Sequence, residues 1–120
     1  MNHAYANNLY KQNQVMTAPK KKLLIMLFDG AIKNLKLAEL SIDSKDIEKT
    51  NTYISKTQNI LTELMSTLNF EAGGDIAKNL YQLYEYMYNR LIRANIDKDI
   101  KTVKEVKIFM EELRDTWEQV

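Results

Sequence analysis

The side chains able to carry out chemistry are few in this sequence, and their spacing does not suit catalysis. The chain has no cysteine and a single histidine, His3. A di-metal carboxylate site in a helical bundle needs a Glu-x-x-His pair on two helices, which one histidine cannot provide. Glu111 and Glu112 would point about 100° apart on a helix, so they cannot converge on one metal ion or substrate atom. We therefore expect no enzyme activity, no metal and no other cofactor.

Patterns that bind phosphate or nucleic acid are also missing. Gly73 and Gly74 precede Asp75 at the start of a predicted helix, where the carboxylate would repel a phosphate. The lysines at 20–22 form a short basic run without interleaved aromatic residues, which is more typical of a solvated helix start than of a nucleic-acid site. The net charge of +1 agrees, because nucleic-acid binders usually carry a strong basic excess. We expect no nucleic-acid partner.

The bulk properties are those of a small globular domain. The length of 120 residues predicts one domain with a single core. The longest uninterrupted apolar run, residues 23–28, is far shorter than the roughly 20 residues that span a bilayer. The N-terminal stretch lacks the basic and apolar regions of a signal peptide. Together with the absence of cysteine, this predicts a cytoplasmic protein that does not insert into a membrane.

Hydrophobic periodicity predicts the fold. Short turns join four helical stretches, so consecutive helices must be antiparallel neighbours. No run alternates with the period of two that marks a strand. We predict an all-α, antiparallel up-down-up-down four-helix bundle over residues 17–120, with residues 1–16 as a flexible N-terminal arm. The predicted helices span about residues 19–42, 45–69, 75–95 and 99–118.

One apolar stripe on each predicted helix is expected to face the core, at alternating spacings of three and four residues. Ser44 is the expected N-cap of the second helix, and Asp97 or Asp99 that of the fourth. Thr50 and Thr57 make the second helix the least apolar inward face. The expected core residues are Leu24, Phe28, Ala31, Leu35, Ala38, Ile42, Ile47, Thr50, Ile54, Thr57, Leu61, Leu64, Leu68, Ala77, Leu80, Tyr84, Met87, Leu91, Ala94, Val103, Val106, Met110, Leu113 and Trp117.

The segment 75–95 carries more apolar surface than one core can use. Its seam is complete, yet the flanking heptad positions widen the apolar stripe beyond the roughly 100° that one core needs. Tyr86 and Ile92 add apolar surface on its outer face. We therefore expect a central helix with neighbours on both sides and surface left for a partner. The flanking residues are Ile76, Tyr81, Leu83 and Tyr88.

The other predicted helices also place apolar residues away from their seams. Single exposed apolar residues mean little, but several on neighbouring helices indicate an interaction surface. The alternatives are cover by the N-terminal arm and a self-interface in a homo-oligomeric structural bundle. The residues alone thus predict a helical bundle with a groove for a peptide or protein partner. The off-seam residues are Leu23, Met26, Leu37, Leu40, Tyr86, Ile92 and Ile108.

An ordered set of short motifs runs through the chain. The motifs are YKQNQVMTA at 10–18, LLIMLFDGA at 23–31, QNI at 58–60, EL at 63–64, LN at 68–69, LYEYM at 83–87, RLIRAN at 90–95, EV at 105–106 and Trp117. This set resembles the FliS family of flagellin-specific export chaperones of bacteria. The resemblance covers nearly the whole chain, and it rests on the order and spacing of the motifs rather than on any one of them. One departure is that Pro19 directly follows Ala18, where the family usually has one residue between.

The resemblance implies a cytoplasmic chaperone that binds the disordered C-terminal region of flagellin. It implies that binding prevents premature polymerisation and that flagellin is then delivered to the flagellar type III export machinery. An adaptor or structural bundle without a chaperone role is the alternative. We expect the free chain to be a monomer or a weak dimer, with the N-terminal arm covering part of the groove. The expected groove residues are Tyr10, Val15, Leu23, Met26, Leu27, Tyr86, Ile92, Ile108 and Phe109.

Overall fold

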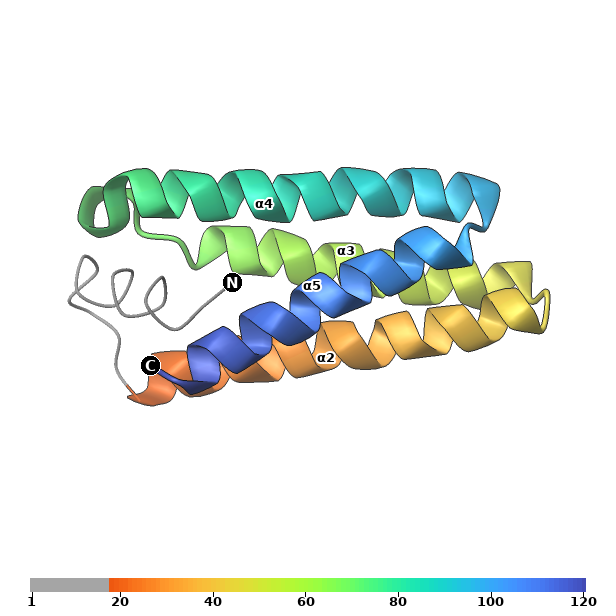
Figure 1. Cartoon of the computed structure of the whole chain (residues 1–120), viewed down its shortest axis with the longest axis horizontal. Helices are drawn as coiled ribbons and strands as arrows, with labels where there is room; N and C mark the ends of the chain where they lie inside the picture. Colours follow the sequence, from red (N-terminus) through yellow and green to blue (C-terminus); the bar gives the residue numbers. More distant parts are fainter. Residues whose placement is uncertain (1–17) are drawn as a thin grey trace.

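The computed structural model describes residues 18–120, which form four antiparallel helices (Figure 1). Helix α2 packs against α3 and α5, and α4 also packs against α3 and α5, so α2 and α4 are diagonal. These residues contain no strand, and the predicted all-α bundle is confirmed. The predicted arm lies outside the described residues. The helices are α2 (Ala18–Asp43), α3 (Ile47–Ser66), α4 (Phe70–Asp97) and α5 (Ile100–Glu118).

The predicted seams form the core. Each of the four helices turns one stripe inward, and the seam residues away from the helix ends are buried. Ile47 is the exception, because it is the first residue of α3 at the end of the bundle and is 63% exposed. Ile42 and Leu68, also at the ends of seams, are only partly buried. Periodicity thus predicts the middle of the core well and its ends poorly.

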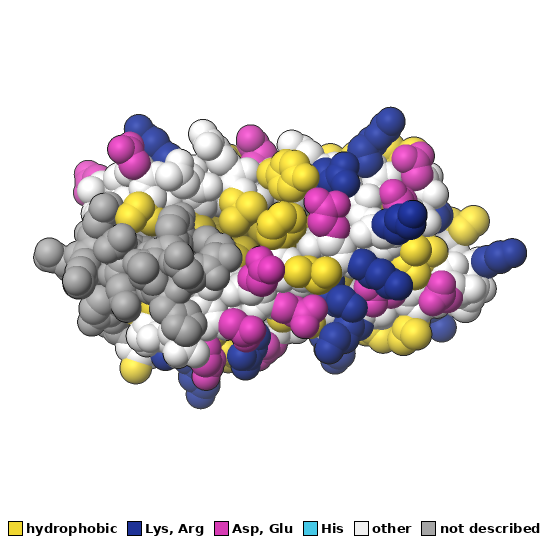
Figure 2. All heavy atoms as spheres, viewed as in Figure 1, with side chains coloured by type: hydrophobic (Ala, Val, Ile, Leu, Met, Phe, Trp, Pro, Cys, Tyr) yellow, Lys and Arg dark blue, Asp and Glu magenta, His cyan; other side chains and the backbone are white. Residues whose placement is uncertain are grey.

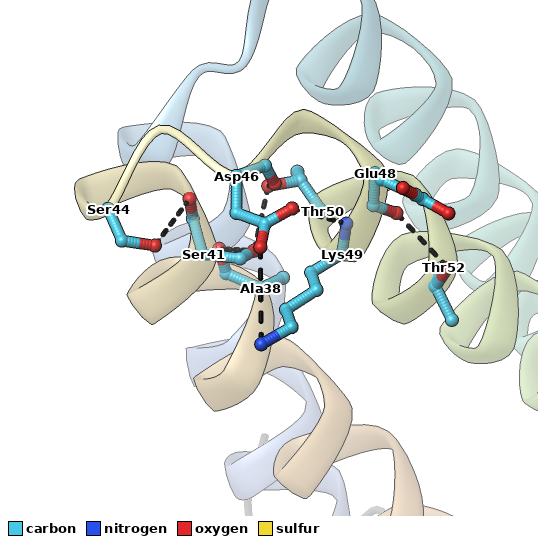
Figure 3. A network of polar contacts seen from close by, with 8 residues as sticks. All are labelled: Ala38, Ser41, Ser44, Asp46, Glu48, Lys49, Thr50 and Thr52. Atoms are coloured by element: carbon cyan, nitrogen blue, oxygen red, sulfur yellow. Dashed lines mark hydrogen bonds and ion pairs between the residues drawn. The ribbon is translucent and has the colours of Figure 1, made fainter.

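A network of hydroxyl and carboxylate groups closes the turn between α2 and α3 (Figure 3). Asp46, not the predicted Ser44, is the N-cap of α3, and its carboxylate accepts a hydrogen bond from the backbone N–H of Lys49 at 3.0 Å. The Ser44 hydroxyl instead donates to the carbonyl of Ser41 at 3.2 Å. The Ser41 and Thr50 hydroxyls lie 2.7 Å apart and are buried. Thr50 therefore points inward with its polar group satisfied, which is what a buried hydroxyl requires.

Helix α4 begins five residues earlier than predicted. The Asn69 side chain caps it by accepting a hydrogen bond from the N–H of Ala72 at 3.0 Å. Gly74 then interrupts the helix with φ 51° and ψ −127°, a kink between one short turn and the long helix. Glycine tolerates this conformation because it has no Cβ. The long part of α4 thus begins directly after Gly74, as the sequence predicted, and only the short helical turn that starts at Phe70 was missed.

Ion pairs and hydrogen bonds attach α5 to α2. Lys107 Nζ lies 2.9 Å from Glu39 Oε2, and both side chains are largely buried. Arg114 Nε donates to Asp29 Oδ1 at 2.6 Å, and this hydrogen bond raises the pKa of Arg114 above its ordinary value. The Lys107–Glu39 pair should fix the rotation of α5 more firmly than the Arg114–Asp29 pair, whose aspartate is 52% exposed, because water screens a buried pair less.

The lysines that begin α2 have a structural explanation. Lys21 Nζ donates to the backbone carbonyls of Glu118 at 3.0 Å and Val120 at 2.8 Å. These carbonyls lie at and just beyond the C-terminal end of α5, where the helix dipole attracts cations. The antiparallel neighbour thus offsets the unfavourable position of Lys21 at the N-terminus of its own helix.

Asp99 is the N-cap of α5, as the sequence allowed. Its carboxylate accepts hydrogen bonds from the Lys101 N–H at 3.0 Å and from the Thr102 hydroxyl at 2.9 Å. The Thr102 hydrogen bond, above all, lowers the pKa of Asp99 below its ordinary value. A lowered folded-state pKa means that the stabilisation is present above the unfolded pKa and is lost as the pH falls through the folded pKa.

Replacement of Tyr84 by alanine tests the core assignment. Tyr84 is 1% exposed, and Tyr84→Ala should lower the free energy of unfolding by about 3–5 kcal/mol, as for other buried aromatic residues. The matched control is Tyr86→Ala, which removes a half-exposed ring and should cost only about 0.5–1.5 kcal/mol. Urea unfolding of both variants measures this, and equal losses would contradict the core assignment.

Replacement of Lys45 by glycine tests the α2–α3 turn. Lys45 has φ 59° in the left-handed region, which is unfavourable for residues with a Cβ by roughly 1–2 kcal/mol. Lys45→Gly should raise the free energy of unfolding by about 0.5–1 kcal/mol, after the greater flexibility of glycine in the unfolded chain is subtracted. Lys45→Ala is the control, because alanine keeps the Cβ. A glycine variant no more stable than the alanine variant would show that the turn is not strained.

Candidate partner-binding surfaces

The α4–α5 surface, defined as Tyr86, Arg90, Glu105 and Phe109, combines an aromatic pair with a charged pair. The Tyr86 and Phe109 rings meet edge to face, with centroids 6.5 Å apart and an interplanar angle of 89°. Arg90 Nη2 donates to Glu105 Oε2 at 2.9 Å, and the Tyr86 hydroxyl donates to Glu105 Oε1 at 3.4 Å. Tyr86 is 46% exposed, so the surface presents an aromatic edge next to a fixed ion pair.

The charged pair of this surface is suited to recognition rather than to stability. The hydrogen bond that Arg90 donates to the Glu105 carboxylate raises the pKa of Arg90 above its ordinary value, so the guanidinium stays charged. Both side chains are 40% exposed, and ion pairs at that exposure contribute little to folding. Arg90 Nε is buried and has no hydrogen-bond partner among residues 18–120. A planar guanidinium held in this way can bind carbonyl or carboxylate groups of a partner.

A second surface, the α3–α4 groove, is an open hollow of about 280 Å³ on another side of α4. Tyr81 and Ile92 extend this groove along α4, because they lie seven residues before and four residues after Tyr88 on the same helix face. The Tyr81 ring also contacts the ring of Phe70, with centroids 6.0 Å apart. The groove is therefore continued by an aromatic and aliphatic stripe. Its lining residues are Thr62, Met65, Glu85, Tyr88 and Asn89.

The third surface, the α2–α3 surface, consists of Leu23, Met26 and Leu27 at the N-terminal end of α2. Leu23 and Met26 are exposed, and Leu27 packs partly against the core. Gly30 continues the spacing of Leu23 and Leu27, and a Cβ at Gly30 would lie 3.3 Å from Ile60 Cδ1 of α3. Leu23 and Leu27 therefore lie on the side of α2 that faces α3.

The structure does not bring the predicted groove residues together on one side. Tyr86 and Ile92 are six residues apart, which places them about 120° apart around α4. Phe109 packs towards Tyr86, whereas Ile108 is 54% exposed on the outer side of α5. Tyr10 and Val15 lie outside the described residues. The predicted set is thus divided among three separate surfaces and the outer face of α5.

Sequence reasoning missed part of these surfaces. Tyr81, Tyr88 and Phe70 border the α3–α4 side but were assigned to the widened core stripe or to a turn. The excess width of the apolar stripe in residues 75–95 was the available signal. It does not tell which flank faces solvent, because that depends on where the neighbouring helices lie. Tyr81 is exposed and Tyr88 partly buried.

Residues 18–120 contain neither a candidate metal site nor a membrane-spanning helix. No cluster of three or more histidine, cysteine, aspartate or glutamate side chains there could hold a metal ion. Among residues 18–120, none of the helices has the length and apolar character needed to cross a membrane. Acidic, basic and apolar side chains all lie on the face shown in Figure 2. The exposed apolar residues of the three surfaces are the candidates for contact with another chain.

Comparison with known proteins agrees with this interpretation. The sequence model of the family described as flagellar protein FliS matches residues 1–120. The flagellar secretion chaperone FliS of Bacillus subtilis is 38% identical over 110 residues, which cover 92% of this chain and 81% of that protein. The protein of the same name from Salmonella typhimurium is 36% identical over 110 residues, covering 91% and 82%. That of Escherichia coli is 33% identical over 109 residues, covering 90% and 80%.

The family model matches the whole chain, and these relatives are 33–38% identical to it over about nine-tenths of its length. The chain belongs to the FliS family of flagellar secretion chaperones.

Proposed function

We propose that this chain is a cytoplasmic chaperone that binds the disordered C-terminal region of flagellin and prevents its premature polymerisation. The observation that carries the proposal is the division of exposed apolar residues among the α2–α3 surface, the α3–α4 groove and the α4–α5 surface. A rigid partner seated in one groove would contact only one of them. A disordered segment that folds on binding can cover all three.

The dimensions of the bundle allow this mode of binding. The molecule measures 45 × 21 × 21 Å, and about 20 extended residues span up to about 66 Å. A segment of that length reaches from one side of the bundle to another. Ordering such a segment costs about 2–5 kcal/mol or more, so several apolar anchors on separate surfaces are needed to give useful affinity.

The proposal includes delivery of flagellin to the flagellar type III export apparatus. The relatives from Bacillus subtilis and Salmonella typhimurium are named flagellar secretion chaperones, and a secretion chaperone must hand its client to an export machinery. No catalytic step is part of the proposal. Binding alone keeps the apolar anchors of the client covered until the export machinery takes it.

Substitutions on the three surfaces test the proposal. We expect each of Met26→Ser, Tyr88→Ala and Tyr86→Ala to weaken binding of a peptide from the flagellin C-terminal region about 5- to 30-fold, the usual cost of removing an interface anchor. Isothermal titration calorimetry measures the affinity, and thermal unfolding shows whether each variant is folded. Ile47→Ser is the matched control for Met26→Ser, because Ile47 is apolar and 63% exposed, close to the 60% of Met26, but lies at the end of the bundle, outside the three surfaces.

The pattern of losses decides the outcome. Losses at only one surface would contradict wrapping of the client around the bundle and favour a single groove. If all three variants bind the peptide as tightly as the unchanged chain does, the client binds to other residues. A loss at Ile47→Ser as large as at the three surfaces would mean that exposed apolar area alone determines binding.

Deletion of residues 1–14 tests whether the N-terminal segment covers part of the client surface. If Tyr10 and Val15 anchor that segment on the bundle, the apparent affinity is reduced by the fraction of molecules in which the surface is open. The deletion should then raise the affinity for the flagellin peptide by the reciprocal of that fraction. Unchanged affinity, together with unchanged amide hydrogen exchange in the helices, would exclude this role.

A further inference from the structure

The outer face of α5 carries charges in an ordered pattern. Five residues on the side opposite the core, spaced three, four, four and three apart, are all exposed. The two at the N-terminal end are lysines, the two at the C-terminal end are acidic, and an isoleucine that is 54% exposed lies in the middle. In Figure 2, which views this face, basic side chains gather towards the N-terminal half of α5 and acidic ones towards its C-terminal half. The residues are Lys101, Lys104, Ile108, Glu112 and Asp115.

This pattern is complementary to itself when one copy is reversed. Lys101 and Asp115 are each seven residues from Ile108, about 10.5 Å along the helix, and Lys104 and Glu112 are each four residues away, about 6 Å. In an antiparallel pair of α5 helices centred on Ile108, the lysines of one copy lie level with the carboxylates of the other. A parallel pair would instead place like charges opposite each other.

We propose that the outer face of α5 binds a second copy of this chain, antiparallel and two-fold symmetric, with the two Ile108 side chains at the axis. Each copy then places Lys101 and Lys104 opposite Glu112 and Asp115 of its partner. A two-fold interface requires this reciprocity, in which a residue and its contact exchange roles between the copies. An unrelated acidic or basic partner would match only one half of the stripe. The inference does not rest on the proposed function.

The same features set the strength of the dimer. All four charged side chains are exposed, so each ion pair is weak and is screened by salt. The Asp115 side chain is 75% exposed, and its Oδ1 lies 3.8 Å from Arg114 Nη1. Asp115 therefore divides its attraction between Arg114 and the lysine of the second copy. A stripe of five side chains covers less area than a stable interface needs. The dimer is therefore transient and forms at high protein concentration and low ionic strength.

The proposed face is compatible with the intact bundle. Lys107 and Arg114, which hold α5 to α2 through Glu39 and Asp29, lie on a different side of the helix. Glu105 on the α4 side pairs with Arg90. The second copy therefore approaches α5 without breaking the contacts that fix this helix in the bundle.

Two charge-reversal variants test the proposal. The first is Lys101→Glu with Lys104→Glu, and the second is Glu112→Lys with Asp115→Lys. Both should fold, because they add acidic residues near the N-terminus of α5 or basic residues near its C-terminus, as the helix dipole favours. The matched control is Lys33→Glu with Lys36→Glu, which changes the net charge as the first variant does but on exposed positions of α2.

Sedimentation equilibrium in about 20 mM salt, where the screening length of about 20 Å is several times the separation of an ion pair, measures self-association. The unchanged chain and the control should dimerise, and added salt should weaken this. Each charge-reversal variant alone should dimerise at least about tenfold more weakly, because four symmetric ion pairs become repulsive. An equimolar mixture of the two should associate again, because all opposing charges then differ in sign.

Three results would overturn the proposal. The first is an unchanged chain that stays monomeric at every concentration. The second is a mixture of the two variants that associates no more tightly than either variant alone. The third is self-association that both variants leave unaltered while they weaken binding of the flagellin peptide, which would assign the face to the client.

Discussion

Four antiparallel helices can bury only one apolar stripe each, and this limit determines what the rest of the surface can do. Leu80, Tyr84 and Leu91 occupy the stripe of α4 and are buried. Apolar residues beside the stripe, such as Leu83 and Tyr88, pack only partly against the core, and those further around the helix cannot reach it, because the positions around a helix are fixed by its period. Tyr86 and Ile92 must therefore lie on the surface, on different sides of α4. The surplus of apolar residues becomes a set of separate binding surfaces rather than a larger core.

Charged contacts then set which residues of α5 face outward. The Lys107–Glu39 and Arg114–Asp29 pairs hold one side of α5 against α2, and the contacts of Glu105 and Phe109 hold another side against α4. These contacts leave only the stripe centred on Ile108 directed at solvent. Two neighbouring residues, Ile108 and Phe109, thus serve different surfaces, since they point about 100° apart on the helix.

The sequence predicts the parts of this structure that depend on one helix alone. The seams were correct because burial on one side of a helix imposes a regular spacing. The N-cap of α3 was misplaced by two residues, because Ser44 and Asp46 are both good capping residues and turn geometry selects between them. The short helical turn before Gly74 was missed, because a pair of glycines is equally typical of a turn without helix. The division of the outer apolar residues among several sides depends on neighbouring helices, which periodicity does not reveal.

Nuclear magnetic resonance of the isotope-labelled chain during titration with a flagellin C-terminal peptide most directly tests the central claim that one client spans separate surfaces. Signals of Leu23, Tyr88 and Phe109 report on the three surfaces. All three signals should shift together, saturate at one peptide per chain and fit a single dissociation constant. Shifts confined to one surface at saturation, or different dissociation constants for the three signals, would contradict this claim.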